Sequence, residues 1–219
     1  MHHDLSGQLL NLACGLFLLT AVGVLWRREV YALITLLTAQ GVTLTAMAIV
    51  LASGQHNAEA VAVAAGVGML KVGIIPSMLR RVYRRIPGAR ETRPLANVSA
   101  SLLAAAGLTL LAYAAARPLV ALAPSASAKA TPVGLAVALI GFFLVTTRQR
   151  AISQIVGVLL IDNGIAAVAF LATGGVPLVV EFGVSADLAL AVLVLQILTT
   201  RLHATFGPAD LDELRELHD

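Results

Sequence analysis

The stretch Ala151–Thr173, AISQIVGVLLIDNGIAAVAFLAT, contains a single charged residue, Asp162, in otherwise largely apolar sequence. A bilayer core about 30 Å thick is crossed by roughly 20 such residues in a helix. The stretch therefore predicts a membrane-spanning helix. An aspartate in the middle of a membrane helix is energetically costly, so Asp162 is a candidate functional residue.

Seven apolar runs along the chain, including this one, are predicted to cross the bilayer by the same criterion of length and apolar composition. The composition agrees, because 58% of the 219 residues are hydrophobic and only 12% are charged, against about 25% charged in a typical soluble domain. Strict alternation and aromatic girdles, which a membrane β-barrel requires, are not present. We expect an all-α integral membrane protein of about seven transmembrane helices, at residues 9–26, 30–52, 58–79, 95–116, 132–147, 151–173 and 178–200.

The runs divide the chain into parts, and the basic residues orient them. We expect a four-helix segment (1–116), an external loop (117–130), a three-helix segment (131–203) and a polar tail (204–219). Twelve of the 15 Lys and Arg residues follow the first, third, fifth and seventh runs. Because cytoplasmic loops collect Lys and Arg, the N-terminus should face outward and the tail should be cytoplasmic. The arginines lie at helix ends rather than in one patch, so we expect no nucleic-acid partner.

Three ionisable residues lie inside the predicted helices, namely Lys71, Asp162 and Asp187. At about 1.5 Å per residue, Asp162 and Asp187 lie about 18 Å and about 20 Å from the cytoplasmic ends of their helices. On the same scale, Lys71 lies about 14 Å deep and Gln40 about 15 Å deep. We therefore expect a polar layer near the middle of the membrane, spread over four helices.

Such a layer is suited to proton movement. Burial favours the neutral form of a carboxyl group, whereas a nearby ammonium favours the ionised form. We interpret Asp162, Asp187 and Lys71 as a proton relay. The alternative is a structural Lys–Asp salt bridge between helices, and the sequence does not decide which aspartate Lys71 contacts.

Four other polar residues are weaker candidates for the relay. Gln40 shares the depth of the charged residues, and Asn163 directly follows Asp162 and can hydrogen-bond to a neighbouring helix. Glu59 and Glu181 lie near outer helix ends, where ordinary solvation explains them unless they form the outer mouth of a proton path.

A catalytic centre is not expected within this chain. Its five histidines lie outside the predicted helices or at their ends, and Cys14 is its single cysteine. One cysteine excludes an intrachain disulfide and a cysteine-held iron–sulfur cluster. A nucleotide-binding glycine motif is also missing. We expect neither a metal nor a cofactor in this chain.

Three stretches carry a resemblance to a known family. They are Leu70–Pro76, with Arg84–Pro87 after it, Gln154–Gly164 and Glu181–Val192. These stretches resemble the family of hydrogenase-4 component E, a membrane subunit. The last three helices of that family, matching residues 131–203 here, are similar to the K subunit of complex I and to component C of Mrp-type sodium/proton antiporters. The resemblance covers most of the chain and agrees with its length and helix count.

The resemblance implies a non-catalytic membrane-arm subunit of an energy-converting hydrogenase or complex I-like respiratory complex in the bacterial cytoplasmic (inner) membrane. Expected partners are other membrane-arm subunits, including antiporter-like ones, a peripheral redox arm and lipid. Nickel–iron, iron–sulfur or flavin centres are expected only in partner subunits. The K subunit of complex I carries a glutamate near the midplane on each of two helices. Asp162 and Asp187 match these positions, with side chains one methylene shorter.

Two other functions fit the same residues. The chain is alternatively a subunit of a cation/proton antiporter or of an ion-coupled uptake system, in which the aspartates serve ion exchange without redox chemistry. A third possibility is a structural spacer, in which the buried charges are ion pairs and the basic residues 80–93 contact anionic lipid or a partner.

Overall fold

The computed structural model describes residues 2–54, 58–84, 97–122, 125, 127–174, 189 and 192. Its elements are helices, because every backbone polar group in lipid must find its partner within the protein. Six spans in this part of the chain are long and apolar enough to cross a membrane. The elements are α1 (His2–Trp26), α2 (Val30–Gly54), α3 (Ala58–Gly68), the π-helix η1 (Met69–Ile74), α4 (Ile75–Tyr83), α5 (Val98–Leu122), the 3₁₀-helix η2 (Ala128–Ala130), α6 (Thr131–Thr147) and α7 (Ala151–Thr173).

The expected seventh helix, at residues 178–200, lies outside the described residues except for Ala189 and Val192. Both of these residues are helical and buried, and they belong to the hydrophobic core. The all-helical class is confirmed for the part of the chain that the structure describes. The count of seven, the orientation and the cytoplasmic tail stay predictions.

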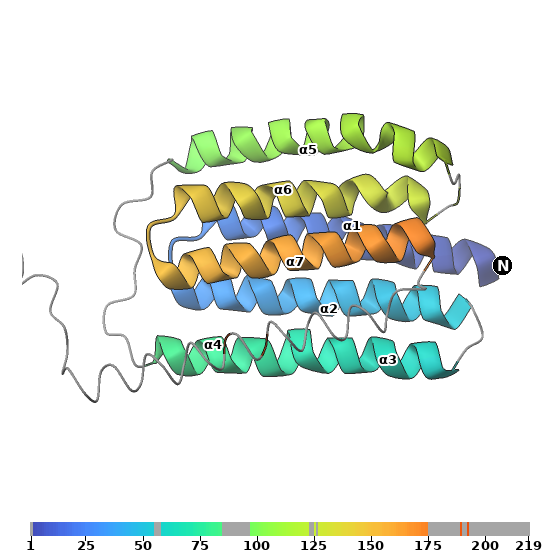
Figure 1. The fold of residues 1–219 in the computed structure, drawn as a ribbon, viewed down its shortest axis with the longest axis horizontal. Coiled ribbons are helices and arrows are strands. Elements are labelled where there is room, and N and C mark those ends of the chain that lie inside the picture. Colours follow the sequence, from blue (N-terminus) through green and yellow to red (C-terminus); the bar gives the residue numbers. More distant parts are fainter. Residues whose placement is uncertain are drawn as a thin grey trace, which may run out of the picture.

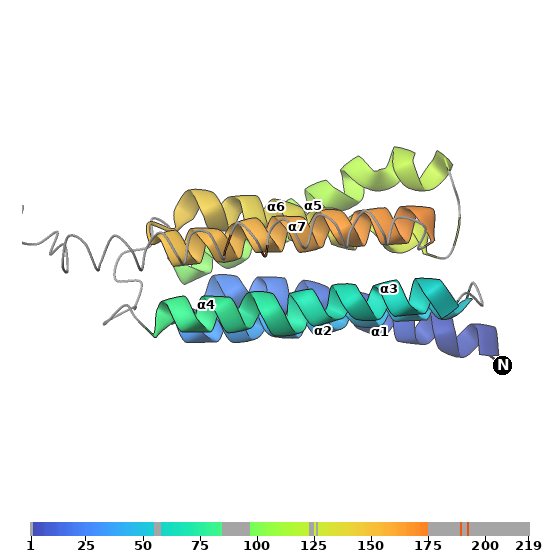
Figure 2. The same ribbon diagram turned by 60° about the horizontal axis from the view of Figure 1, so that its bottom comes forward.

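The spans form two layers (Figures 1 and 2). One layer contains α1, α2 and a continuous span made of α3, η1 and α4, which we call the third span. The other layer contains α5, α6 and α7. The layers pack on each other where α2 contacts α7 and where α1 contacts α6. Residues far apart in the sequence therefore meet between α2, the third span and α7.

Helix α5 begins and ends later than the sequence indicates. It runs through Arg117 and Pro118 to Leu122, so the first part of the expected external loop (117–130) is helical. Arg117 did not end the helix, since a long basic side chain near a helix end can reach the membrane surface while its backbone stays helical. In Figure 2 the C-terminal half of α5 leans away from α6.

Arg148 joins the two layers at the end opposite the N-terminus. Its Nη2 donates to the backbone oxygens of Leu25 (3.1 Å) and Arg27 (3.0 Å). These carbonyls lie at the C-terminal end of α1. The last carbonyls of a helix have no partner within the helix, and Arg148 supplies one here. Arg148 is buried, so this arginine, which the sequence places in a basic loop, is also a contact between α6 and α1.

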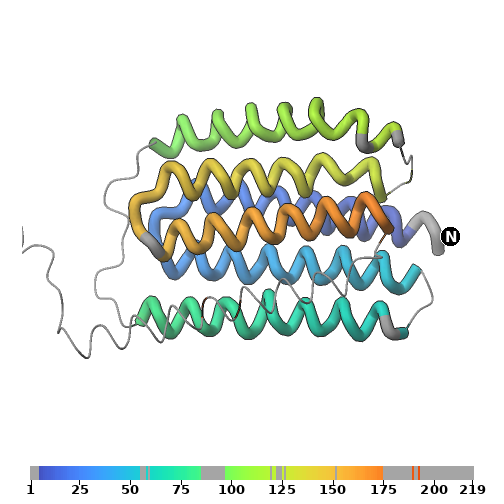
Figure 3. Tube along the Cα trace, viewed as in Figure 1, coloured from blue at the N-terminus to red at the C-terminus, as the bar shows by residue number. Residues whose placement is uncertain are grey.

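Glycines allow α6 and α7 to pack backbone against backbone (Figure 3). A Cβ added at Gly134 would lie 2.7 Å from the Val168 nitrogen, and one at Gly141 would lie 2.8 Å from the Ile161 nitrogen. A Cβ at Gly164 would overlap the backbone of Ala138. Small residues are the usual means of close helix association in membranes, where van der Waals packing drives assembly.

We expect Gly164→Ala to lower the thermal stability of the protein and to disturb the neighbouring Asp162, because the added methyl forces α7 away from α6. Gly107→Ala on α5 is the matched control, since nothing lies within 4 Å of its added Cβ. Thermal denaturation of both variants in detergent measures the difference. Equal stability of the two variants would contradict the packing described.

Candidate functional site

Lys71 lies in a turn of π-helix within the third span. Ile75 donates its backbone N–H to the Leu70 oxygen, five residues earlier, instead of four. Pro76 lies at the start of α4, and its missing N–H and its ring disfavour a regular α-helix through the preceding turn. The sequence left open whether Pro76 kinks the helix; the structure shows a widened turn before it. Such turns are frequent at functional sites.

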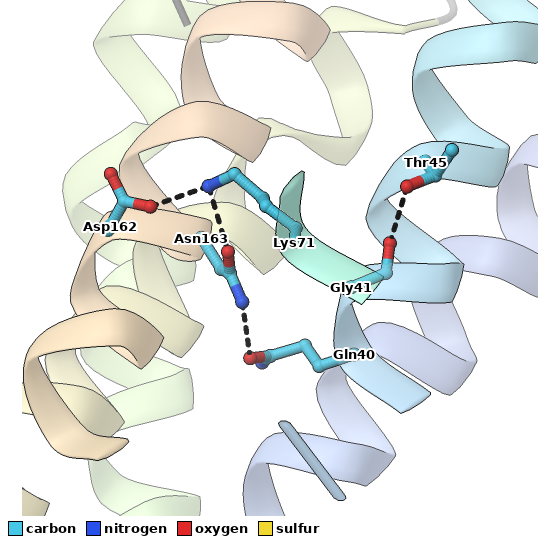
Figure 4. Close-up of polar contacts among 6 residues, drawn as sticks. All are labelled: Gln40, Gly41, Thr45, Lys71, Asp162 and Asn163. Atoms are coloured by element: carbon cyan, nitrogen blue, oxygen red, sulfur yellow. Dashed lines mark hydrogen bonds and ion pairs between the residues drawn. The ribbon is translucent and has the colours of Figure 1, made fainter. Parts of the chain in front are cut away.

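The widened turn lies directly against α2. A Cβ added at Gly41 would lie 2.9 Å from the backbone oxygen of Lys71. Thr45 donates to the Gly41 oxygen at 2.7 Å (Figure 4). Gly68 also faces Thr45, whose Cγ2 would lie 2.5 Å from an added Cβ. Glycines on both helices therefore bring the Lys71 backbone next to α2 and allow its side chain to reach α7.

The side chains of Lys71, Asp162, Asn163 and Gln40 form one hydrogen-bonded group, which we call the Lys71 cluster (Figure 4). Lys71 Nζ lies 2.5 Å from Asp162 Oδ2 and donates to Asn163 Oδ1 at 2.9 Å. Asn163 Nδ2 in turn donates to Gln40 Oε1 at 3.1 Å. The cluster connects α2, the third span and α7.

The cluster is enclosed by protein. Gln40 is 0% exposed, Lys71 and Asn163 are each 4% exposed, and the Asp162 side chain, the most accessible member, is 11% exposed. A buried charge is tolerated when it is paired and hydrogen-bonded. Lys71 and Asp162 neutralise each other, and the amide oxygen of Asn163 provides the ammonium with a further acceptor.

The structure brings together four of the residues that the sequence singles out, and it shows one partner of Lys71 among the described residues. Lys71 contacts Asp162. Asp187 and Glu181 lie outside the described residues. Glu59 belongs to the first turn of α3, about 18 Å along the span from Lys71 at about 1.5 Å per residue. Within the described residues, no group of three His, Cys, Asp or Glu side chains could hold a metal ion.

Two features of the site were missed by reasoning from sequence. One is the π-helix, which decides the direction in which Lys71 projects. The other is the role of Gly41, whose position directly after Gln40 is the signal that could have revealed it. Glycines at 41, 68 and 73 and a proline at 76 surround Lys71 and Gln40, and such a concentration indicates close backbone packing or an irregular turn.

Comparisons with known proteins connect the chain to few characterised relatives. The uncharacterized protein Rv0085 of Mycobacterium tuberculosis is 44% identical over 212 residues, which are 96% of this chain and 96% of that protein. Hydrogenase-4 component E of Escherichia coli and that of Shigella flexneri are each 27% identical over 147 residues, which are 67% of this chain and 68% of the relative. No family model matches the chain, and no solved structure matches it.

We expect the Lys71–Asp162 pair to behave as a coupled unit in stability measurements. Lys71→Met and Asp162→Asn should each lower the free energy of unfolding by about 3–5 kcal/mol, because each leaves one buried charge without its partner. The double variant should lose less than the sum of the two single losses, since no charge is then stranded. A double-mutant cycle on denaturation of the protein in detergent measures the coupling.

Thr109→Val on α5 is a control for this cycle, since the Thr109 hydroxyl bonds only to the Ala105 oxygen of its own helix among the described residues. Its effect should add to that of Lys71→Met. Simple additivity of Lys71→Met and Asp162→Asn would show that the pair contributes no coupling.

Proposed function

Because this chain belongs to the same family as Rv0085 of Mycobacterium tuberculosis and is similar to hydrogenase-4 component E, we propose that it is a non-catalytic membrane-arm subunit. The complex is an energy-converting hydrogenase or a complex I-like respiratory complex in the bacterial cytoplasmic membrane. The subunit contributes to a proton path near the middle of the bilayer. The observation that carries the proposal is the Lys71–Asp162 pair, an enclosed ion pair in a largely apolar helical bundle.

In this proposal Asp162 is a relay acid and Lys71 controls its charge. The Lys71 ammonium, 2.5 Å away, offsets the charge of the Asp162 carboxylate. When Lys71 moves away, or when the pair is wetted, the carboxylate is left in a medium of low dielectric and takes up a proton. Return of the ammonium drives that proton off. Asp187, on the expected seventh helix, is the next relay acid, and Glu59 and Glu181 form the outer mouth.

Asn163 and Gln40 serve this path by holding Lys71 in place. Carboxamides neither gain nor lose a proton at neutral pH, so they orient charged groups rather than store protons. Asn163 supplies the acceptor that directs the ammonium toward α7, and Gln40 holds Asn163. Their part is therefore positioning, and the two aspartates and Lys71 carry the charge.

The chemistry that drives the proton path belongs to partner subunits in this proposal. Redox centres of the nickel–iron, iron–sulfur or flavin kind are in a peripheral arm, and antiporter-like subunits extend the membrane arm. The exposed apolar side chains of α5, which include Leu103 and Leu110, are available to lipid or to such subunits.

We expect Asp162→Asn and Asp187→Asn each to abolish proton pumping while the complex stays assembled, because an amide cannot carry the proton. Proton uptake into vesicles that contain the complex measures pumping, and native gel electrophoresis measures assembly. Asp162→Glu, which keeps a carboxyl group, is the matched control and should retain part of the activity. Normal pumping by both asparagine variants would rule out the relay and leave the ion pair a structural role.

We also expect the tagged chain, purified from its native membranes in a gentle detergent, to bring down a redox arm and antiporter-like subunits. Mass spectrometry identifies the companions. Antiporter-like subunits without a redox protein would instead assign the chain to cation/proton exchange, which the same aspartates could serve. Recovery of the chain alone would overturn its assignment to a complex.

A further inference from the structure

Gln40 ends the Lys71 cluster with a hydrogen-bond donor that has no partner within the described residues. The Gln40 side chain is fully buried in α2, and its Nε2 forms no hydrogen bond in that part of the chain. Buried amide groups are almost always satisfied, by protein or by bound water. The Gln40 amide therefore marks a position where a hydrogen-bond acceptor is needed.

The direction of this donor follows from the charge on Lys71. An ammonium group only donates, so the Asn163 atom that faces it is the oxygen. The Asn163 nitrogen consequently faces Gln40, which must present its oxygen in return. Turning the Gln40 amide by half a turn would place its NH₂ group against the NH₂ group of Asn163. The amide nitrogen of Gln40 is thus held away from Asn163 by a chain of contacts that begins at Lys71.

We propose that the Gln40 Nε2 group binds an internal water molecule. Water is a small neutral acceptor, and internal waters commonly satisfy buried polar groups in proteins. Among the described residues, the carboxylate that belongs to the cluster, that of Asp162 on α7, is engaged by Lys71. The binding of this water rests on the geometry of the Lys71 cluster alone.

The water has a defined place in the proton path, and this part of the inference rests on the proposed function. When Lys71 moves away from Asp162, as the proposed function requires, the Asn163 oxygen loses the ammonium as its donor. Asn163 and Gln40 can then reverse together, because no ammonium holds the Asn163 oxygen toward the third span, and Gln40 presents an oxygen to the water. The water meets a donor while Lys71 is in place and an acceptor after the two amides reverse. The two amides thereby transmit the position of Lys71 to the water.

X-ray hydroxyl-radical labelling of native membranes that contain the full chain tests the site, because radicals formed from a bound water oxidise the side chains beside it. Leu37 and Leu44 lie one turn before and one turn after Gln40, and both are buried. After correction for the intrinsic reactivity of each type of side chain toward hydroxyl radical, we expect their labelling in the wild type to exceed severalfold that of Phe17 and Ala21, which are also buried, on α1. Mass spectrometry of the digested protein measures the labelling.

Gln40→Leu, which removes the donor, should reduce the labelling of Leu37 and Leu44 to the level of Phe17 and Ala21. Gln40→Glu should keep it, because a protonated carboxyl group can accept from Asn163 and donate to the water. Gln8→Leu makes the same change at an exposed glutamine of α1 and should leave the labelling unchanged. Wild-type labelling no higher than that of α1, or labelling that persists in Gln40→Leu, would overturn the site. Labelling that behaves as expected in a complex whose aspartate variants still pump would keep the water and reject only its place in a proton path.

Discussion

The contact between Lys71 and Asp162 is the interaction on which the rest of the site depends. A lone charge in the middle of a bilayer costs several kcal/mol, so each residue is tolerable there chiefly because of the other. The third span must widen into a π-helix to direct Lys71, and α2 must carry glycine at position 41 to let that turn approach. Asn163 and Gln40 then complete the environment of the ammonium.

The spans and the members of the cluster could be predicted from sequence, whereas their geometry could not. Hydropathy reports which residues avoid water, and a lysine or aspartate in an apolar run is conspicuous for that reason. The partner of Lys71 depends on how helices are arranged, which hydropathy does not encode. The π-helix arises from Pro76 acting on the preceding turn, and the extension of α5 past Arg117 arises because the end of a helix is set by backbone pairing rather than by the first charge.

Contacts within the second layer and contacts between the two layers depend on different interactions. Within the second layer, glycines bring the backbones of α6 and α7 together by close packing. Between the layers, hydrogen bonds from Lys71, Asn163 and Arg148 cross from one set of helices to the other. Packing is insensitive to protonation, whereas the interlayer contacts made by Lys71 depend on charge. A change of charge at the cluster therefore acts mainly on how the layers meet.

The separation of Lys71 and Asp162 along the chain has a consequence for biosynthesis. The two residues are 91 positions apart, and at about 5–20 residues per second the ribosome needs roughly 5–20 s to make that length. The third span thus reaches the membrane with a lysine whose partner does not yet exist. The ion pair can form only after α7 has been made, so the contact that joins the two layers at the cluster is a late step of assembly even though the third span is synthesised early.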